Sequence, residues 1–340
     1  MTKILVRSWV PIRKMIFLLD GMPNDFVAVL EDFVNDLPSA LLNLVNDVES
    51  VEVQLDSPPE NVLQDLLQLV GENLDIPEWY EFIRIDCVVN YELEVIQSQS
   101  KALEINEGML SGMAACLVSG DVADALCLAQ LAYPMRIKSA KGRSWIDGEA
   151  YNAIKSLDGF PYDLLSNIEG GWPNLGIIKL SDVSSWEVKL GLFDNGVAKT
   201  PVQRALASFT HACALPTSSR GEALFWAMQG LEAFYCRGTG DLRNQLSEKS
   251  KIFLGPWNDK KNIVGKMYDF RSKFVHGSFN LQRWNNNREL EDFSDEDDFY
   301  AAYSLAIRML FATLHQCVID DIAAVDFEYK ISPRKLESDS

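Results

Sequence analysis

The segment NIVGKMYDFRSKFVHG, residues 262–277, predicts the architecture of the second half of the chain. At about 100° per residue, a helix places four of its apolar side chains on one side: Ile263, Met267, Phe270 and Phe274. Glycine favours the position just after a helix, because it adopts a left-handed backbone conformation without strain. We therefore expect a helix over residues 262–276 that ends at Gly277 and buries one face in a helical bundle.

The same helix has a second, partly apolar face, formed by Val264, Tyr268, Ser272 and Val275. Arg271 and His276 lie about 140° apart around the helix axis and bracket this face. A helix with apolar residues on two sides contacts a second element or a second chain with the side that its own bundle leaves free. If that contact is a two-fold dimer, two arginines and two histidines line one cleft.

Arg271 and His276 are a minimal pair for cleaving a phosphodiester without a metal. A guanidinium holds an anionic phosphate with two hydrogen bonds, and an imidazole transfers protons near neutral pH. The negative end of the helix stabilises a protonated imidazole by up to about 2 kcal/mol. The alternative is structural: Arg271 pairs with Asp269 or Glu232, and His276 caps the last carbonyls. The spacing alone does not decide between the two.

The charge around this pair differs from that of the rest of the chain. Residues 241–288 contain ten Lys/Arg and four Asp/Glu, a local charge of +6, whereas all 340 residues carry −18, which leaves −24 elsewhere. Such an acidic protein is not a general nucleic-acid binder. The basic segment either forms an anion-binding surface around Arg271 and His276 or is the locally basic window that any long chain contains.

The second half of the chain favours a bundle of five helices, expected at residues 200–215, 223–236, 241–254, 262–276 and 299–322. Thr200 is a suitable N-cap for the first of them and Pro201 a suitable first residue. Ser219 and Glu222 have the spacing of a capping box before the second.

The first half favours a mainly helical region with a few short strands. Helical periodicity covers residues 26–45 and 61–70, and alternation over residues 51–55 predicts a strand. Residues 83–89 fit either a strand or a helix. Residues 109–132 favour a hairpin of two helices, broken at Ser119-Gly120-Asp121. The charges within residues 1–20 interrupt any signal-peptide core and predict folded protein there.

Glycine and proline residues cluster between residues 141 and 176 and predict a domain boundary, followed by a short strand at residues 176–180. We expect residues 1–170 to form an N-terminal region with a sensor or regulatory role, residues 176–330 the helical bundle, and residues 331–340 a polar tail. The predicted fold class is thus mainly α.

Composition limits the environment and the cofactors. Apolar residues make up 47 % of the chain, which is enough for buried cores. No window approaches the roughly 18 uninterrupted apolar residues of a membrane span. The six cysteines have neither disulfide nor metal spacing, which predicts a reducing, cytoplasmic location. No cluster of histidines and carboxylates indicates a metal site, so no metal or other cofactor is expected.

The other histidines and the tryptophans are weaker candidates. His211 lies in a helix of small apolar residues, where a core or boundary position is expected. His315 lies near Cys317 in the last helix, but one histidine and one cysteine make no metal site. Trp284, between Arg283 and Arg288, is the best candidate for stacking on a nucleic-acid base.

Residues 176–282, about a third of the chain, resemble the Apea-like branch of the HEPN domains. The most specific likeness is residues 267–277, MYDFRSKFVHG, which resemble the family's "lYdlRSkivHG" signature. Residues 228–235 resemble its "alEaLy"-type helix, and residues 242–254 its "qLseka..lLg" segment. Residues 175–180 and 201–209 look like the family's lead-in and first helix.

The resemblance implies a HEPN-like bundle that acts as a dimeric, metal-independent ribonuclease. Arg271 would bind the scissile phosphate, and His276 would transfer a proton as a ribose 2′-hydroxyl attacks, which leaves a cyclic phosphate. Tyr268, Ser272 and Lys273 would contact the phosphate or the ribose. Glu232 matches the family's acidic position and would either orient Arg271 or form a structural ion pair with it.

The expected function is therefore an endoribonuclease effector, of the anti-phage, abortive-infection or toxin-like kind. RNA is the expected substrate, a homodimer formed through the bundle is the expected assembly, and a phage-derived or antitoxin-like protein is a possible trigger. Two alternatives stay open. The bundle is a non-catalytic module that binds RNA, a nucleotide or a protein, or it is a structural scaffold that dimerises through its last two helices.

Overall fold

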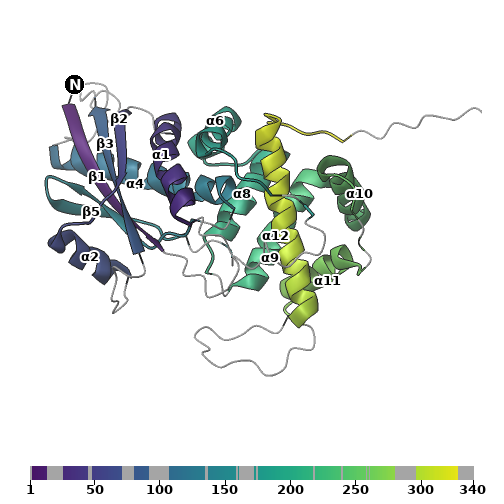
Figure 1. Ribbon diagram of the computed structural model, residues 1–340. Coiled ribbons are helices and arrows are strands. Elements are labelled where there is room, and N and C mark those ends of the chain that lie inside the picture. The colour runs from purple at the N-terminus through teal and green to yellow at the C-terminus, as the bar shows by residue number, and fades with distance from the viewer. Residues whose placement is uncertain are drawn as a thin grey trace, which may run out of the picture.

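A computed structural model describes residues 2–13, 26–44, 48–70, 80–91, 107–134, 137–157, 160, 172–173, 175–216, 219–238, 240–257, 259, 261–279 and 296–327. The described residues are mainly α-helical, with one five-stranded sheet. The sheet lies at one end of the molecule and the helical bundle at the other (Figure 1). This confirms the predicted mainly α class with a few strands.

The sheet joins strands from distant parts of the first half of the chain. Its members are β1 (Thr2–Arg13), β2 (Val48–Leu55), β3 (Tyr80–Tyr91), β4 (Gly142–Ile146) and β5 (Glu149–Ile154). The order is β2-β3-β1-β4-β5, and all neighbours are antiparallel. The predicted strand at residues 51–55 is confirmed, and residues 83–89 are resolved as strand.

Alternating side chains of the central strands serve two separate cores. Val6 and Val10 of β1 and Ile85 of β3 are fully buried on the inner face, in the main core that also contains α1 (Phe26–Leu44) and α4 (Glu107–Ala132). On the outer face, α2 (Glu60–Val70) buries a smaller cluster. This cluster consists of Val62, Leu66, Trp9, Tyr80, Phe82, Ala140 and Trp145.

The prediction of a helical hairpin at residues 109–132 is wrong, because α4 is one continuous helix from Glu107 to Ala132. Ser119 does not cap a second helix. Its buried hydroxyl lies 2.8 Å from the hydroxyl of Ser144 on β4, which in turn lies 2.7 Å from that of Ser8 on β1. Val118 and Val122 are buried on either side of the expected break, so packing against the sheet holds this segment helical.

The second half contains α6 (Leu180–Leu190), α7 (Leu192–Asn195), α8 (Pro201–Cys213), α9 (Arg220–Tyr235), α10 (Leu242–Leu254), α11 (Ile263–Val275) and α12 (Glu296–Ile319). The five predicted helices of the bundle, α8 to α12, are confirmed. The strand predicted at residues 176–180 is wrong, because residues 175–179 are irregular and Leu180 begins a helix.

Two predicted helix caps have different outcomes. The hydroxyl of Thr200 accepts a hydrogen bond from the backbone N–H of Gln203, and the side-chain oxygen of Gln203 accepts one from the backbone N–H of Thr200. Pro201 follows as the first helical residue. The predicted N-cap is therefore confirmed. The capping box predicted at Ser219 is wrong, because the Ser219 side chain makes no cap bond and its backbone is not extended.

The two halves of the molecule share one continuous hydrophobic core. Helix α6 lies against α1, where the Asn43 amide donates to the Ser184 hydroxyl at 3.0 Å and Asp36 accepts the N–H of Ser181 at 3.0 Å. The predicted division near residue 170 stays a prediction, since residues 161–171 lie outside the described ranges. The predicted tail also lies outside them.

By length and composition, two of the described helices match membrane spans: residues 108–132 of α4 and 297–319 of α12. Of these windows, 56 % and 83 % respectively are buried inside the protein. Both helices contribute to the core of this fold, as apolar core helices of water-soluble proteins also do.

Candidate functional site

Helices α9 and α11 lie side by side and form the framework of the candidate site. The ring of Phe274, in the last turn of α11, lies over Gly221 in the first turn of α9. A Cβ atom at position 221 would lie 3.1 Å from this ring, closer than ordinary van der Waals contact, so a larger residue there requires the ring to shift by a few tenths of an ångström. Phe225, one turn further along α9, contacts the same ring at 6.2 Å between centroids.

Helix α11 ends in a Schellman motif, with Gly277 in the predicted position just after the helix. Gly277 has φ of 71°, the backbone N–H of Ser278 donates to the carbonyl of Lys273 at 2.9 Å, and that of Gly277 donates to Phe274 at 3.3 Å. His276 is the C-cap residue and is exposed. Its side chain has no hydrogen-bonded partner among the described residues, so the imidazole is accessible at the helix end.

Arg271 forms an ion pair with Glu232 of α9. The Nη2 atom of Arg271 lies 3.1 Å from Oε2 of Glu232, and the two side chains are 28 % and 13 % exposed. Burial raises the pKa of the Glu232 carboxyl, and the neighbouring Arg271 charge counteracts part of this rise. Of the two partners that the sequence suggested for Arg271, the structure therefore pairs it with Glu232 and leaves Asp269 exposed.

Three polar atoms of this cluster are buried without a hydrogen-bond partner in the described structure: Oε1 of Glu232, Nε of Arg271 and the hydroxyl of Tyr268. Burial raises the pKa of the Tyr268 hydroxyl far above its ordinary value, and the nearby Cys236 and Glu232 raise it further. Tyr268 thus stays protonated next to the Glu232 carboxylate. No hydrogen bond of normal geometry joins them.

The remaining predicted site residues lie on the surface of α11. Ser272 and Lys273 are exposed in its last turns, near His276. The ammonium of Lys273 lies 4.9 Å from the centroid of the Phe270 ring, within the range of a cation–π contact. The structure therefore brings Glu232, Tyr268 and Arg271 together and places Ser272, Lys273 and His276 on the exposed end of the same helix.

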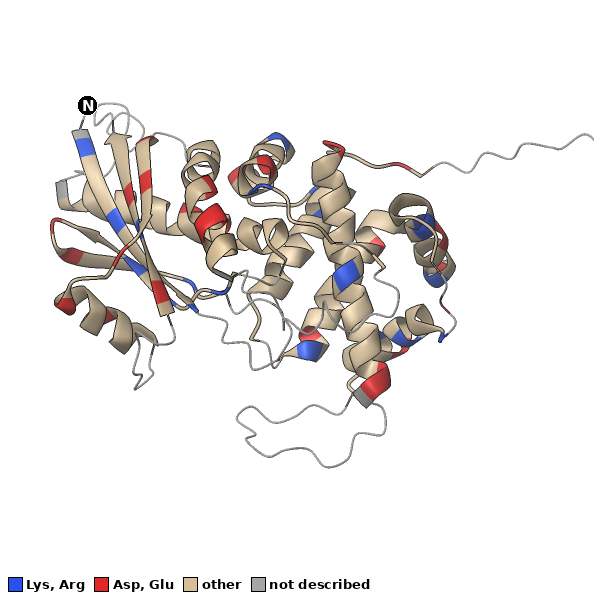
Figure 2. Cartoon of the chain, viewed as in Figure 1, with Lys and Arg blue, Asp and Glu red and all other residues tan. Residues whose placement is uncertain are grey.

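The basic segment around the site is partly neutralised. Lys266 of α11 pairs with Asp298 of α12, and Arg243 of α10 hydrogen-bonds Asn262. Lys249 is 3 % exposed and hydrogen-bonds Gln245 at 2.9 Å. Basic residues on α10 and α11 are interspersed with acidic ones (Figure 2). The excess of positive charge in the sequence is thus not one continuous basic surface over the described residues.

The prediction for His211 is wrong, because this residue is exposed rather than part of the core or its boundary. Its ring stacks on that of Trp226 with centroids 4.2 Å apart and an angle of 11° between the planes. In the sequence His211 follows Ser208, Phe209 and Thr210, which suggested a buried position. On α8, however, the helical spacing places His211 on the solvent-facing side. His211 and Trp226 form an aromatic surface pair that sequence reasoning missed.

The other weaker candidates are now placed or lie outside the described residues. His315 is 4 % exposed, hydrogen-bonds the carbonyl of Leu131, and has its pKa lowered by burial. It is therefore a neutral core residue. Trp284, Arg283 and Arg288 lie outside the described residues.

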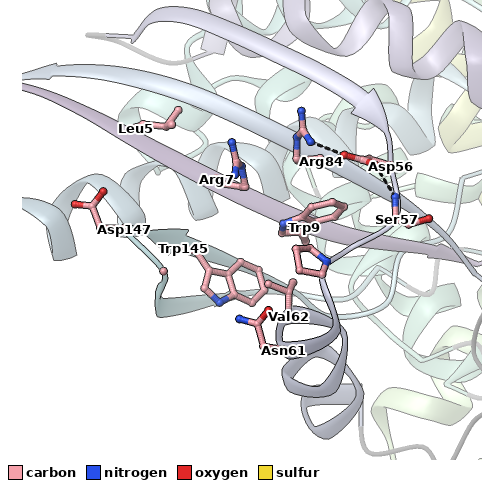
Figure 3. Close-up of a pocket in the computed structure, with 12 residues that line it drawn as sticks. Leu5, Arg7, Trp9, Asp56, Ser57, Asn61, Val62, Arg84, Trp145 and Asp147 are labelled. Atoms are coloured by element: carbon pink, nitrogen blue, oxygen red, sulfur yellow. Dashed lines mark hydrogen bonds and ion pairs between the residues drawn. The ribbon is translucent and has the colours of Figure 1, made fainter.

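A separate groove of about 400 Å³ lies on the outer face of the sheet, beside the start of α2 (Figure 3). Its floor contains Trp9 and Trp145. Arg7 donates two hydrogen bonds to Asp86, at 2.7 and 2.9 Å, and Arg84 is bound to Asp56. Both arginines are thus neutralised by carboxylates. The sequence did not predict this groove, since its strands meet only in the folded sheet.

Within the described residues, no group of three or more His, Cys, Asp or Glu side chains is arranged to hold a metal ion. No family model matches the chain, and neither a curated protein nor a solved structure matches it. The resemblance to the HEPN domains stays a prediction.

Proposed function

We propose that the bundle α8–α12 is a metal-independent endoribonuclease of the HEPN type, acting as an anti-phage, abortive-infection or toxin-like effector. The observation that carries this proposal is the end of α11. The exposed His276 lies between one and two helical turns after Arg271. The guanidinium of Arg271 is partly exposed and is paired with the carboxylate of Glu232. A positioned guanidinium and an accessible imidazole are the two groups that cyclising cleavage of RNA requires.

In this proposal Arg271 binds the scissile phosphate and His276 transfers the proton. His276 accepts the proton of the ribose 2′-hydroxyl as this oxygen attacks the phosphorus and the bond to the 5′-oxygen of the next nucleotide breaks. The protonated imidazole then gives its proton to that 5′-oxygen. The products are a 2′,3′-cyclic phosphate end and a 5′-hydroxyl end. Ser272 and Lys273, exposed on the same helix end, contact the RNA backbone.

The site would be composite. On one helix, Arg271 and His276 are separated by about 140° around the axis and about 7.5 Å along it. A two-fold dimer through the exposed side of α11 would bring His276 of one copy toward Arg271 of the other. Val275, which is 52 % exposed between them, fits such a contact. The N-terminal region, with its sheet, would restrain the site or receive the trigger.

The test is cleavage of total RNA by the purified protein in the presence of EDTA, with the new ends mapped. We expect cyclic-phosphate ends from wild type and none from Arg271→Ala or His276→Ala. Arg204→Ala and His211→Ala are matched controls, because both side chains are exposed on α8. Equal cleavage by all five proteins would contradict the proposal.

One observation favours a second candidate function, a non-catalytic module that binds RNA, a nucleotide or a protein. The charge of Arg271 is already neutralised by Glu232, which leaves less positive charge to stabilise the additional negative charge that develops on a reacting phosphate. The same assay separates the two functions. RNA binding that depends on Arg271 but yields no cyclic-phosphate ends would favour the module.

A further inference from the structure

Four side chains on the outer face of the sheet lie together along the groove beside α2. Arg7 of β1 lies opposite Trp145 of β4 in the register of the two antiparallel strands. Leu5 precedes Arg7 by two residues and Asp147 follows Trp145 by two, so both lie toward the same end of the strands and on the same face. All four line the groove (Figure 3). One cation, one acid and two apolar side chains thus meet there.

Arg7 presents one edge of its guanidinium to the groove. Its Nε and Nη2 atoms donate to the Asp86 carboxylate at 2.7 and 2.9 Å, which fixes the plane of the group. This pair uses two of the five N–H groups of an arginine and leaves three, including both on Nη1. The side chain is 44 % exposed. Asp86 therefore neutralises the charge of Arg7 but leaves N–H groups that can donate to the oxygens of a ligand carboxylate.

Asp147 is an exposed acid whose side chain forms no hydrogen bond or ion pair with the residues that the structure describes. Asp147 and Gly148 are the two residues of the turn between β4 and β5, with φ of 50° and 85°. A two-residue turn with both φ angles positive matches the twist of the strands that it joins, so it has a well-defined conformation. The Asp147 carboxylate is therefore held beside the groove, where it can pair with a cationic group.

Apolar side chains lie between and beside these two charged residues. Opposite residues of antiparallel strands are about 5 Å apart and each residue adds about 3.4 Å along a strand, so the Cα atoms of Arg7 and Asp147 are about 8 Å apart. Leu5, which lies between them on the same face, is 48 % exposed. Pro59 and Val62, at the start of α2, line the groove as well. A ligand that spans the two charges therefore contacts apolar side chains along its length.

The charge of the surroundings favours a ligand without net charge. The lining of the groove contains two arginines and two acids: Arg7, Arg84, Asp56 and Asp147. Residues 1–170 contain 11 Lys/Arg and 27 Asp/Glu, a formal charge of −16. This region repels a net anion such as a nucleotide, and the two arginines in the lining disfavour a net cation. A zwitterion, with one charge of each sign at opposite ends, is complementary to the groove and is not repelled.

We propose that this groove binds a dipeptide with apolar side chains. An extended dipeptide spans about 7 Å between its two ends, close to the separation of Arg7 and Asp147, whereas a single amino acid spans about half of that. The carboxylate of the dipeptide accepts hydrogen bonds from Arg7, its ammonium pairs with Asp147, and its side chains contact Leu5 and Trp145. The volume of about 400 Å³ lies in the usual range of small-molecule sites. This binding does not depend on the proposed ribonuclease, because the groove contains no residue of that site.

Isothermal titration calorimetry of the full chain tests the ligand class with leucyl-leucine and two blocked forms of it. N-acetyl-leucyl-leucine lacks the ammonium, and leucyl-leucinamide lacks the carboxylate. We expect each blocked form to bind at least about tenfold more weakly than leucyl-leucine, because each loses one charged contact. Equal affinity for all three compounds would overturn the proposal. So would a dissociation constant of leucyl-leucine above about 10 mM, or tighter binding of the anion adenosine monophosphate.

Two variants test which residue binds which end of the dipeptide. Asp147→Asn keeps the turn, because asparagine also favours positive φ there. It should weaken binding of leucyl-leucine about tenfold and leave that of N-acetyl-leucyl-leucine unchanged. Arg7→Lys keeps a cation beside Asp86 but loses the planar fork, so it should weaken binding of leucyl-leucine and not that of leucyl-leucinamide. Glu149→Gln is the control, since Glu149 is exposed next to the turn but does not line the groove.

The melting temperature of each variant is measured first, and all three should match wild type. The control should bind all three compounds as wild type does. Unchanged binding of leucyl-leucine by Asp147→Asn would overturn the proposal. An equal loss of affinity for the free and the blocked compounds in both variants would also overturn it, because the two residues would then not distinguish the two ends of the ligand.

Discussion

The guanidinium of Arg271 lies 3.1 Å from the carboxylate of Glu232, so the arginine proposed to bind phosphate is already bound to an anion. An incoming phosphate must share Arg271 with Glu232 or displace it. The same carboxylate fixes the direction of the guanidinium. Glu232 therefore has two opposed effects in the proposed reaction: it weakens phosphate binding, and it positions the group that stabilises the reacting phosphate.

Glu232→Gln should separate these two effects. Removing the negative charge should tighten RNA binding about threefold to tenfold at low salt, since a charge next to Arg271 is worth about 1 kcal/mol or more. Single-turnover cleavage should become slower, because the guanidinium loses its fixed direction. RNA affinity and cleavage rate are measured with the same substrate. Glu222→Gln, an exposed acid on the same helix, should change neither, and equal changes in both variants would rule out this role of Glu232.

The ion pair should also be visible in stability. Arg271→Ala leaves the Glu232 carboxylate, only 13 % exposed, without its counter-charge, and should lower the free energy of unfolding by about 1–3 kcal/mol. Adding Glu232→Gln to this variant should recover part of the loss. Urea unfolding of the four proteins gives the coupling between the two residues. Strictly additive effects would mean that the pair contributes nothing to stability.

The helices of the bundle could be predicted from sequence because their signals are local. Thr200 with Pro201 begins α8, and Gly277 ends α11, each by hydrogen bonds within a few residues. The pairing of Arg271 with Glu232 could not be predicted with certainty, because Asp269 also lies near Arg271 in the sequence. The choice depends on how α9 and α11 lie against each other, with Gly221 under Phe274.

The sheet could be predicted only in part for the same reason. Arg7 lies opposite Asp86 and Trp145 in the register of β1, β3 and β4, and nothing in the local sequence of β1 indicates these partners. The continuity of α4 through Ser119-Gly120-Asp121 is also a tertiary effect. The Ser119 hydroxyl hydrogen-bonds the Ser144 hydroxyl on β4 instead of capping the end of a helix. A local turn signal does not decide the structure where a residue of a distant element forms the hydrogen bond of the same polar side chain.

The two predicted caps provide a matched pair of variants. Thr200→Ala removes a hydroxyl that accepts the Gln203 N–H, and should lower the free energy of unfolding by about 1 kcal/mol. Ser219→Ala removes a hydroxyl that makes no cap bond, so its effect should be within about 0.5 kcal/mol. Denaturant titration at one pH measures both. A larger loss in Ser219→Ala than in Thr200→Ala would contradict the cap assignment.

Asp121 should make stability depend on pH. Burial, together with Asp124, raises the pKa of Asp121 from 3.8 to about 7. The folded state therefore holds its proton more tightly than the unfolded state, and this contribution to stability is lost as pH rises from about 4 through 7. Asp121→Asn stays neutral, so its gain in stability over wild type should be smaller at pH 5 than at pH 8. Urea midpoints at both pH values test this. A larger gain in stability for Asp121→Asn at pH 5 than at pH 8 would contradict the raised pKa of Asp121.

Gly221 should control the distance between α9 and α11, and with it the site. Gly221→Ala places a Cβ atom about 3.1 Å from the Phe274 ring. The Phe274 ring, or helix α11 with it, must shift by a few tenths of an ångström. We expect this shift to lower the free energy of unfolding by about 1–2 kcal/mol and to slow RNA cleavage, because Glu232 and Arg271 lie on these two helices. Gly240→Ala, where nothing lies within 4 Å of the added atom, is the control.

The second variant that tests this relationship is Gly221→Ala with Phe274→Leu. The smaller side chain should make room for the new methyl group and restore part of both stability and cleavage rate, although Phe274→Leu alone should be destabilising. Such compensation between a glycine and the ring above it would show that the distance between the helices positions Arg271. If cleavage stays at the wild-type rate in Gly221→Ala while stability falls, the Arg271–Glu232 pair tolerates the displacement, and the geometry of this pair does not limit the reaction.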